Sequence, residues 1–240
     1  MNLSFSGSGF LLAFHIGVAN YFRRQGYISA KSRFAGASGG SLVAASLAYD
    51  VPMANVLDET KNTARSIHED LKKKKMFNLS SYVNKHIGAL FPEDLPIHDF
   101  PRLVIATTQV WPRVRTVHWT DFPNKDFLAD RMLLSCHVPW YFDGTPARRI
   151  DGKEWHADGG LLCFVPEVED HVKVSIIPMP WDRKTISPAL IPNFPISSAR
   201  LLQWALLPPS NEMLDKIVSL GEEAAEIWDV SRSQGDSVAA

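Results

Sequence analysis

One five-residue stretch has the composition and spacing of a nucleophile on a tight turn. It reads Gly36-Ala37-Ser38-Gly39-Gly40, so a serine is flanked on both sides by small residues. In this G-x-S-x-G pattern the serine occupies a strained turn between a strand and a helix, where larger neighbours would clash. The pattern predicts Ser38 as a nucleophile, provided that a strand precedes it and a helix follows. An ordinary glycine turn is the alternative interpretation.

A second glycine-rich turn, near the N-terminus, offers the amide donors that a serine nucleophile requires. Attack on a carbonyl produces an oxyanion, and N–H groups must be aimed at the place where its charge develops. Gly7, Ser8 and Gly9 precede an apolar segment that we expect to be a helix, whose first N–H groups lack partners within it. We therefore expect an oxyanion hole at these three residues. A phosphate-binding loop is the alternative, but neither G-x-G-x-x-G nor G-x-x-x-x-G-K-S/T occurs here.

Asp158 is the best-placed base for Ser38. It follows a predicted strand and precedes two glycines, which permit an unusual backbone at a strand end. None of the eight histidines has a setting typical of a catalytic triad, and we expect them to be core or surface residues. Asp151 also precedes a glycine, but Asp-Gly between two β-rich runs is typical of a hairpin turn.

Two strand–turn–helix units must position these residues. They comprise a strand at 2–6 with a helix at 10–25, and a strand at 33–35 with a helix at 41–49. This repeated order of strand, glycine turn and helix indicates a parallel α/β sheet.

The rest of the chain predicts further helices, strands and one long loop. Residues 53–90 are expected to be helical, and the other expected elements are strands at 102–110, 113–119 and 172–177, a hairpin at 148–156, and helices at 125–136, 198–207 and 211–229. Five prolines between 178 and 195 exclude a sheet interior and indicate a surface loop.

Length and composition limit the class of protein. With 240 residues, of which 45% are hydrophobic and 21% charged, we expect one globular domain over 1–230 and a polar tail over 231–240. A net charge of -1 gives no general attraction to nucleic acid, which is not an expected partner. Two cysteines form no disulfide framework and fit a reducing compartment. Without a signal-peptide pattern or a spanning segment, we expect a cytoplasmic protein.

Three motifs in this order resemble the patatin-like phospholipase family: the glycine-rich first turn, the Ser38 turn, and Asp158 followed by two glycines. The resemblance extends beyond them, and is greatest to the animal adipose triglyceride lipase and adiponutrin branch. The segments similar to that branch are Phe5-Ser6-Gly7-Ser8-Gly9-Phe10-Leu11 with His15 and Gly17, Ser135-Cys136-His137-Val138-Pro139, and Ala205-Leu206-Leu207-Pro208-Pro209. Only the region 53–100 is loosely similar.

The resemblance implies a three-layer α/β/α fold with a mostly parallel central sheet, and a Ser38–Asp158 dyad that hydrolyses acyl esters without a histidine. It also implies that the Gly39 amide assists the oxyanion hole, and that no cofactor or metal is required. Plant and bacterial patatins carry a basic residue in a Gly-Gly-Gly-x-Arg-Gly turn, whereas here Phe10 and Leu11 follow Gly9. This difference favours neutral acylglycerols over phospholipid headgroups.

Three alternatives remain open at the level of sequence. They are a phospholipase A or lysophospholipase, an acyltransferase that uses the same acyl-enzyme, and a lipid-binding scaffold with weak catalysis. An enzyme acting on lipids must also meet a membrane or lipid-droplet surface. The candidate contacts are Lys72, Lys73, Lys74 and Lys75, and a proline-rich loop with Trp181, Ile191 and Phe194. A solvated helix face is an equally acceptable interpretation of the lysines.

Overall fold

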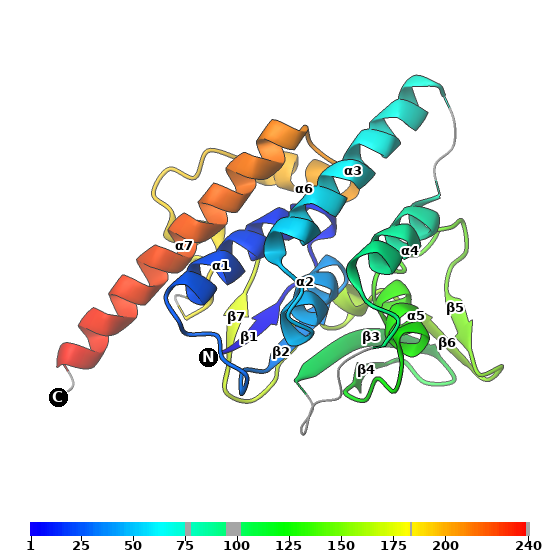
Figure 1. Cartoon of the computed structure of the whole chain (residues 1–240), viewed down its shortest axis with the longest axis horizontal. Helices are drawn as coiled ribbons and strands as arrows, with labels where there is room; N and C mark the ends of the chain where they lie inside the picture. The colour runs from blue at the N-terminus through cyan, green and yellow to red at the C-terminus, as the bar shows by residue number, and fades with distance from the viewer. Residues whose placement is uncertain (75–77, 95–101, 183, 239–240) are drawn as a thin grey trace.

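The computed structural model describes residues 1–74, 78–94, 102–182 and 184–238, which fold around a seven-stranded sheet (Figure 1). The parallel strands are β1 (Asn2–Phe5), β2 (Phe34–Ala37), β3 (Leu103–Trp111) and β7 (His171–Val174), and the antiparallel ones are β4 (Arg115–Trp119), β5 (Arg148–Ile150) and β6 (Glu154–Ala157). Hydrogen-bonded strands follow one another in the sequence β5-β6-β3-β2-β1-β7, and β4 also pairs with β3. The predicted α/β class with a mostly parallel central sheet is confirmed.

The helices pack on this sheet and on one another. They are α1 (Leu12–Arg24), α2 (Gly39–Ala48), α3 (Met53–Lys72), α4 (Leu79–Leu90), α5 (Lys125–Ser135), α6 (Ser198–Leu206) and α7 (Asn211–Val238), with short 3-10 turns η1 (Gly9–Leu11), η2 (Gly159–Leu161) and η3 (Pro188–Leu190). Helix α2 lies against β1, β2 and β3, while α1 runs beside α7 (Figure 1). Helix α1 contacts α2, α3 and α7, which explains why its sequence is apolar around much of its circumference.

The bounds of several elements differ by a few residues from the sequence prediction, and two helices differ in an informative way. Helix α2 begins at Gly39 rather than two residues later, because the backbone of Ser38 ends β2 and starts the helix within one residue. Helix α7 continues to Val238, through the segment predicted as a polar tail. Among the described residues, no helix has the length and apolar character needed to span a membrane.

The register of β3 determines where the ends of β2 and β6 meet. Strand β4 pairs with Ile105–Gln109 of β3. The part of β3 that pairs with β2 and the part that pairs with β6 each overlap this range, so β2 and β6 must both lie along the other edge of β3. They approach from opposite directions: β2 ends at Ala37, beside Ala106, and β6 ends at Ala157, beside Thr108. The residues that follow these two strand ends therefore converge at the level of Thr107.

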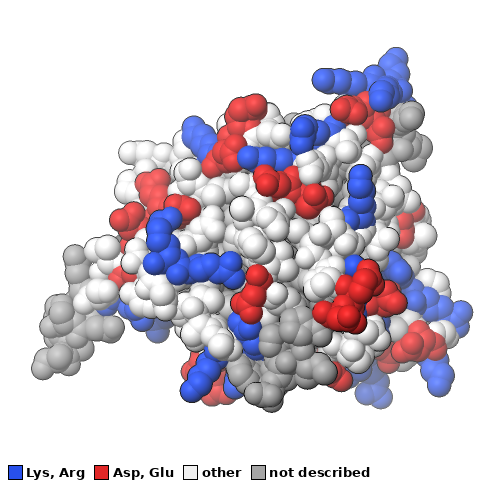
Figure 2. Space-filling view, in the orientation of Figure 1, with Lys and Arg blue, Asp and Glu red and all other residues white. Residues whose placement is uncertain are grey.

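Charged residues of both signs are mixed over the face shown in Figure 2. A group of basic side chains marks the far tip of α3, where Lys72, Lys73 and Lys74 are exposed (Figures 1 and 2). Lys75 lies outside the described residues.

Candidate active site

Ser38 occupies a strained turn between β2 and α2. Its backbone has φ 51° and ψ −132°, a conformation that is rare for a residue with a side chain. Three hydrogen bonds maintain this turn: the Ser41 amide and hydroxyl donate to the Ser38 carbonyl at 2.8 and 2.7 Å, and the Ser38 amide donates to Oγ of Ser135 at 2.8 Å. This is the strand–turn–helix geometry that the sequence predicted for a nucleophile.

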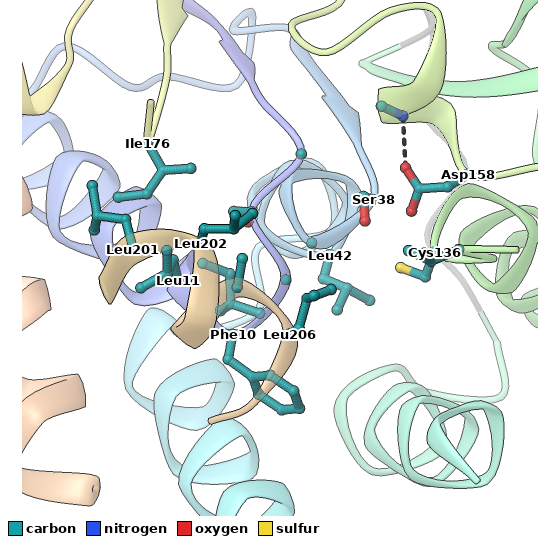
Figure 3. Close-up of a pocket in the computed structure, with 18 of the residues that line it drawn as sticks. Phe10, Leu11, Ser38, Leu42, Cys136, Asp158, Ile176, Leu201, Leu202 and Leu206 are labelled. Carbon is teal, nitrogen blue, oxygen red and sulfur yellow. Dashed lines mark hydrogen bonds between the residues drawn. The ribbon is translucent and has the colours of Figure 1, made fainter. Parts of the chain in front are cut away.

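Asp158 follows the end of β6 and faces Ser38 across the gap between the two strand ends (Figure 3). Its amide donates to the His137 carbonyl at 2.7 Å, and its Oδ1 accepts a 2.7 Å hydrogen bond from the Gly160 amide. Oδ2 is buried and has no hydrogen-bond partner within 3.5 Å among the described residues. One carboxylate oxygen is thus fixed by the backbone, and the other is available to the Ser38 hydroxyl.

Burial gives this carboxyl the basicity of a group that titrates near neutrality. Removal from water raises the pKa of Asp158 from 3.8 to about 6, because the charged form loses its hydration. The Gly160 amide, bonded to Oδ1, and the Ser38 hydroxyl, which is near the carboxylate without a well-formed hydrogen bond to it, both lower this pKa in part because they favour the charged form. A base with this pKa is ionised at neutral pH and is still able to accept a proton.

Ser135 connects the nucleophile to the sheet and was not among the predicted site residues. Its buried hydroxyl accepts from the Ser38 amide at 2.8 Å and donates to the Ala106 carbonyl of β3 at 2.7 Å. Two residues later, the His137 carbonyl holds the amide of Asp158. The last residue of α5 and the segment directly after it therefore position both members of the pair. A lone serine at a helix end has no local pattern that would reveal this role.

The predicted oxyanion turn separates into residues with paired and unpaired amides. The Gly7 amide donates to the Phe164 carbonyl at 2.8 Å, so it is not free to bind an oxyanion. The amides of Ser8, Gly9 and Gly39 have no acceptor within the part of the chain that the structure describes. Gly39 lies directly against this turn, since a Cβ there would be 2.6 Å from the Ser8 hydroxyl and 2.7 Å from the Gly9 carbonyl.

Ser38 and Asp158 lie in the wall of a cavity of about 660 Å³. Ligand sites generally have volumes of about 300–1,000 Å³. Apolar side chains dominate the wall: Leu11, Ile176, Leu201 and Leu202 line it on one side of Ser38 (Figure 3). No lysine or arginine is among the described residues that line it.

This arrangement can be compared with known proteins. The sequence profile described as patatin-like phospholipase matches residues 3–169, which include Ser38 and Asp158. The chain belongs to this family. The resemblance inferred from the motifs is therefore confirmed.

The curated relatives of this family member differ in length. Human patatin-like phospholipase domain-containing protein 4 is 27% identical over 242 residues, which cover 92% of this chain and 93% of the relative. Mouse patatin-like phospholipase domain-containing protein 5 is 28% identical over 166 residues, which cover 63% and 37%. Human 1-acylglycerol-3-phosphate O-acyltransferase PNPLA3 is 26% identical over 182 residues, which cover 74% and 37%. The chain thus spans nearly all of one relative and less than half of the others.

The structure was also compared with a solved one. VipD from Legionella pneumophila aligns over 73% of this chain and 49% of its own, with a TM-score of 0.44 and 14% sequence identity.

In this patatin-like chain, no histidine among the described residues hydrogen-bonds Ser38. His98 lies outside the described residues, and of the other seven only His86 lines the cavity. His15, in α1, is fully buried, and burial lowers its pKa to about 4.

Asp151, the alternative aspartate, occupies the turn between β5 and β6 at φ 47°, as predicted for a hairpin. No group of three or more potential metal ligands is present among the described residues.

The proline-rich loop offers fewer exposed apolar side chains than predicted. Ile191 is only 6% exposed and belongs to the hydrophobic core, and Phe194 packs against that core. Trp181 is 78% exposed and is the remaining candidate for lipid contact among the three.

Proposed function

We propose that this chain is a lipid acyl-ester hydrolase that acts on acylglycerols through a Ser38–Asp158 dyad. The observation that carries the proposal is the strained Ser38 facing a buried, incompletely hydrogen-bonded carboxylate in the wall of an apolar cavity. Membership of the patatin-like phospholipase family supports a lipid as the substrate.

In the first half of the reaction, Oδ2 of Asp158 takes the proton of the Ser38 hydroxyl while the serine oxygen attacks the ester carbonyl carbon. The tetrahedral oxyanion accepts hydrogen bonds from the amides of Ser8, Gly9 and Gly39. Its collapse breaks the bond between the carbonyl carbon and the alcohol oxygen. Asp158 returns its proton to the departing alcohol, which leaves an acyl group on Ser38.

In the second half, water takes the place of the alcohol. Asp158 removes a proton from the water as it attacks the acyl-enzyme, and the proton then passes to Oγ of Ser38 when the acid leaves. Gly7 has a different role from the one predicted: its paired amide fixes the turn, and a Cβ there would lie 3.3 Å from the ring of Phe164.

The cavity wall favours a neutral acylglycerol over a phospholipid headgroup. A phosphate group is usually held by arginine, lysine or several amide donors. The described wall contains neither of these basic side chains, and its free amides lie at the oxyanion position. An uncharged glycerol ester needs no such partner.

Exposed apolar side chains at the cavity rim would meet the lipid surface. Leu161, Ile177, Leu202 and Leu206 all line the cavity and are 40–69% exposed. Contiguous exposed apolar side chains commonly mark an interaction site. This rim is a stronger candidate for membrane or lipid-droplet contact than Lys72–Lys74, which do not line the cavity. The predicted location stays the cytoplasm, with peripheral binding to such surfaces.

Hydrolysis of a monoacylglycerol by matched variants tests the proposal. Ser38→Ala is expected to abolish turnover, and Asp158→Asn to reduce kcat by about 10²–10⁴-fold, the usual contribution of a general base. Asp151→Asn removes the exposed hairpin aspartate and should leave kcat unchanged. Full activity of Asp158→Asn, or loss of activity only when a histidine is replaced, would contradict the dyad.

Acyl transfer is a second candidate because a relative carries an acyltransferase name, 1-acylglycerol-3-phosphate O-acyltransferase PNPLA3. The same acyl-enzyme would then be attacked by an alcohol in place of water. Adding a monoacylglycerol acceptor to a reaction with labelled acyl ester discriminates between the two. Label in free fatty acid supports hydrolysis, and label in diacylglycerol supports transfer.

A further inference from the structure

The antiparallel part of the sheet, where β5 and β6 form one edge, carries two exposed tryptophans (Figure 1). Trp111, the last residue of β3, is 62% exposed, and Trp155, in β6, is 38% exposed. The two residues are register partners, so their side chains lie next to each other on one face of the sheet. Neither lines the cavity at Ser38. Adjacent exposed apolar side chains commonly mark an interaction surface.

An irregularity in β3 explains why Trp111 is exposed. Gln109 pairs with His156, and both side chains are buried, but the register shifts between Gln109 and Trp111. On a regular strand, residues two apart share a face, so Trp111 would point the same way as Gln109. The shift instead pairs Trp111 with Trp155, the neighbour of His156, whose side chain points to the opposite face. The extra residue in β3 thus turns an indole ring away from the buried side.

Basic side chains surround the two tryptophans. Arg149 is the register partner of Trp155, and its guanidinium carbon lies 6.0 Å from the centroid of the Trp155 ring. Arg113, in the turn between β3 and β4, and Lys153, in the turn between β5 and β6, are exposed. None of these three cations forms a salt bridge within the part of the chain that the structure describes. Their charges are therefore available to a partner.

Nearby acidic residues do not cancel this positive charge. Residues 111–115 and 149–155 together contain four basic side chains and two acidic ones: Arg113, Arg115, Arg149 and Lys153, against Asp151 and Glu154. Oε2 of Glu154 already lies 3.2 Å from Nε2 of His156. The local excess of basic residues contrasts with the net charge of -1 of the whole chain, so this region attracts anions although the protein as a whole does not.

We propose that these residues form a Trp–Arg patch that binds the surface of a membrane containing anionic phospholipids. The patch consists of Trp111, Arg113, Val114, Arg149, Lys153 and Trp155, and Val114 is 69% exposed. Tryptophan is enriched at the boundary between membrane and water, where its ring enters the apolar layer and its N–H meets the headgroups. Basic side chains at the same level are attracted by the negative charge of the lipid.

The choice of a lipid surface as the partner rests on the proposed function, and the patch adds which lipid charge is preferred and which face of the protein meets it. Trp155 precedes Asp158 by three residues of an extended segment, so the patch begins about 10 Å along the chain from the catalytic carboxylate. A membrane bound at the patch is thus close to the active site.

Flotation with matched double variants tests the charge of the patch. The wild-type protein should bind phosphatidylcholine vesicles more tightly when they contain phosphatidylserine, and high salt should remove the difference. Arg113→Gln with Lys153→Gln should weaken binding to the phosphatidylserine vesicles about 25-fold, or about fivefold for each basic residue. Lys31→Gln with Lys216→Gln is the control, because it removes the same charge from exposed positions in the loop before β2 and in α7. Equal binding by the two double variants would overturn the proposal.

A fluorescence measurement tests the contact of the indole rings. Lipids with brominated acyl chains quench tryptophans that enter the membrane. Trp111→Phe with Trp155→Phe keeps two aromatic rings and should lose most of the quenching seen with the wild-type protein. Undiminished quenching would overturn the proposal.

Two results separate the patch from the hydrolase function. Equal affinity of the wild-type protein for vesicles with and without phosphatidylserine would overturn the patch whether or not the variants fold. A soluble ester should be hydrolysed with unchanged kcat/KM by all these variants, because no residue of the patch lines the cavity. If the wild-type protein binds phosphatidylserine vesicles through the patch but hydrolyses no ester, the patch is supported and the hydrolase function alone is overturned.

Discussion

The carboxyl group of Asp158 links the activity of the site to pH. Its pKa of about 6 means that the proton-accepting form is lost as the pH falls through 6. We expect kcat/KM to decrease about tenfold per pH unit below that value, as measured on a soluble ester. A pH profile that is flat from pH 5 to 8 would show that Asp158 is not the base.

The raised pKa of Asp158 also makes stability depend on pH, in the direction opposite to that of activity. Between 3.8, the ordinary value, and about 6, the folded protein binds a proton at Asp158 that the unfolded chain has lost. The stability contributed by this proton is full below the ordinary pKa and is lost as the pH rises through 6. Asp158→Asn should therefore be more stable than the wild type at pH 8, by about 3 kcal/mol in the free energy of unfolding, with a smaller difference at pH 5. Asp151→Asn should show no such trend.

Ser135 acts on Ser38 through the backbone. Ser135→Ala removes both the acceptor of the Ser38 amide and the donor to Ala106. We expect kcat to fall by about 10- to 100-fold with an unchanged KM, because the nucleophile loses its position while the cavity stays intact. Ser46→Ala is the control: Ser46 is equally buried, but its hydroxyl has no partner among the described residues. Equal kinetics for the two variants would exclude a positioning role.

At the scale of elements, the N-terminus of α2 packs directly against the turn that precedes η1. Gly39→Ala would place a Cβ 2.7 Å from the Gly9 carbonyl and push the two sources of oxyanion donors apart. Loss of one such donor typically costs about 10²–10³ in kcat. Gly88→Ala, in α4, meets no atom within 4 Å and should stabilise the helix by about 0.5–1 kcal/mol with normal kcat. Normal turnover by Gly39→Ala would remove this turn from the mechanism.

The local part of the site could be predicted from the sequence, because strand, glycine turn and helix are adjacent along the chain. The sequence therefore predicts the turns at Ser38 and at Gly7–Gly9. The setting of Asp158 at a strand end predicts its role as well. Its approach to Ser38 depends on β2 and β6 pairing with the same edge of β3, and register between distant strands has no local signal.

Three further features depend on contacts between distant segments. The Gly7 amide is paired with Phe164, Ser135 supports Ser38, and Ile191 is drawn into the core. In each case the partner lies far away in the sequence, and the local residues fit other roles equally well. A glycine turn and an apolar residue in a loop have no pattern that distinguishes these outcomes.

At the scale of the whole molecule, the cavity rim determines how the protein meets lipid. Leu202→Ser removes a 69% exposed side chain at the rim and should lower the partition of the protein onto phosphatidylcholine vesicles about tenfold in a flotation assay. Val230→Ser changes a 51% exposed residue on α7 that does not line the cavity, and should bind normally. A triple Lys→Gln variant at 72–74 tests the lysines separately, because loss of their charge should weaken binding to anionic vesicles alone. Unchanged flotation of Leu202→Ser would place the lipid contact elsewhere.

The central claim is that Asp158 activates Ser38, and labelling with a fluorophosphonate tests it most directly. Such a probe forms a stable bond with an activated serine, and mass spectrometry identifies the modified peptide. The wild-type protein should be labelled at Ser38, and Asp158→Asn should react at least about 100-fold more slowly. Labelling of another residue, or equal labelling rates for the wild type and Asp158→Asn, would contradict the Ser38–Asp158 dyad.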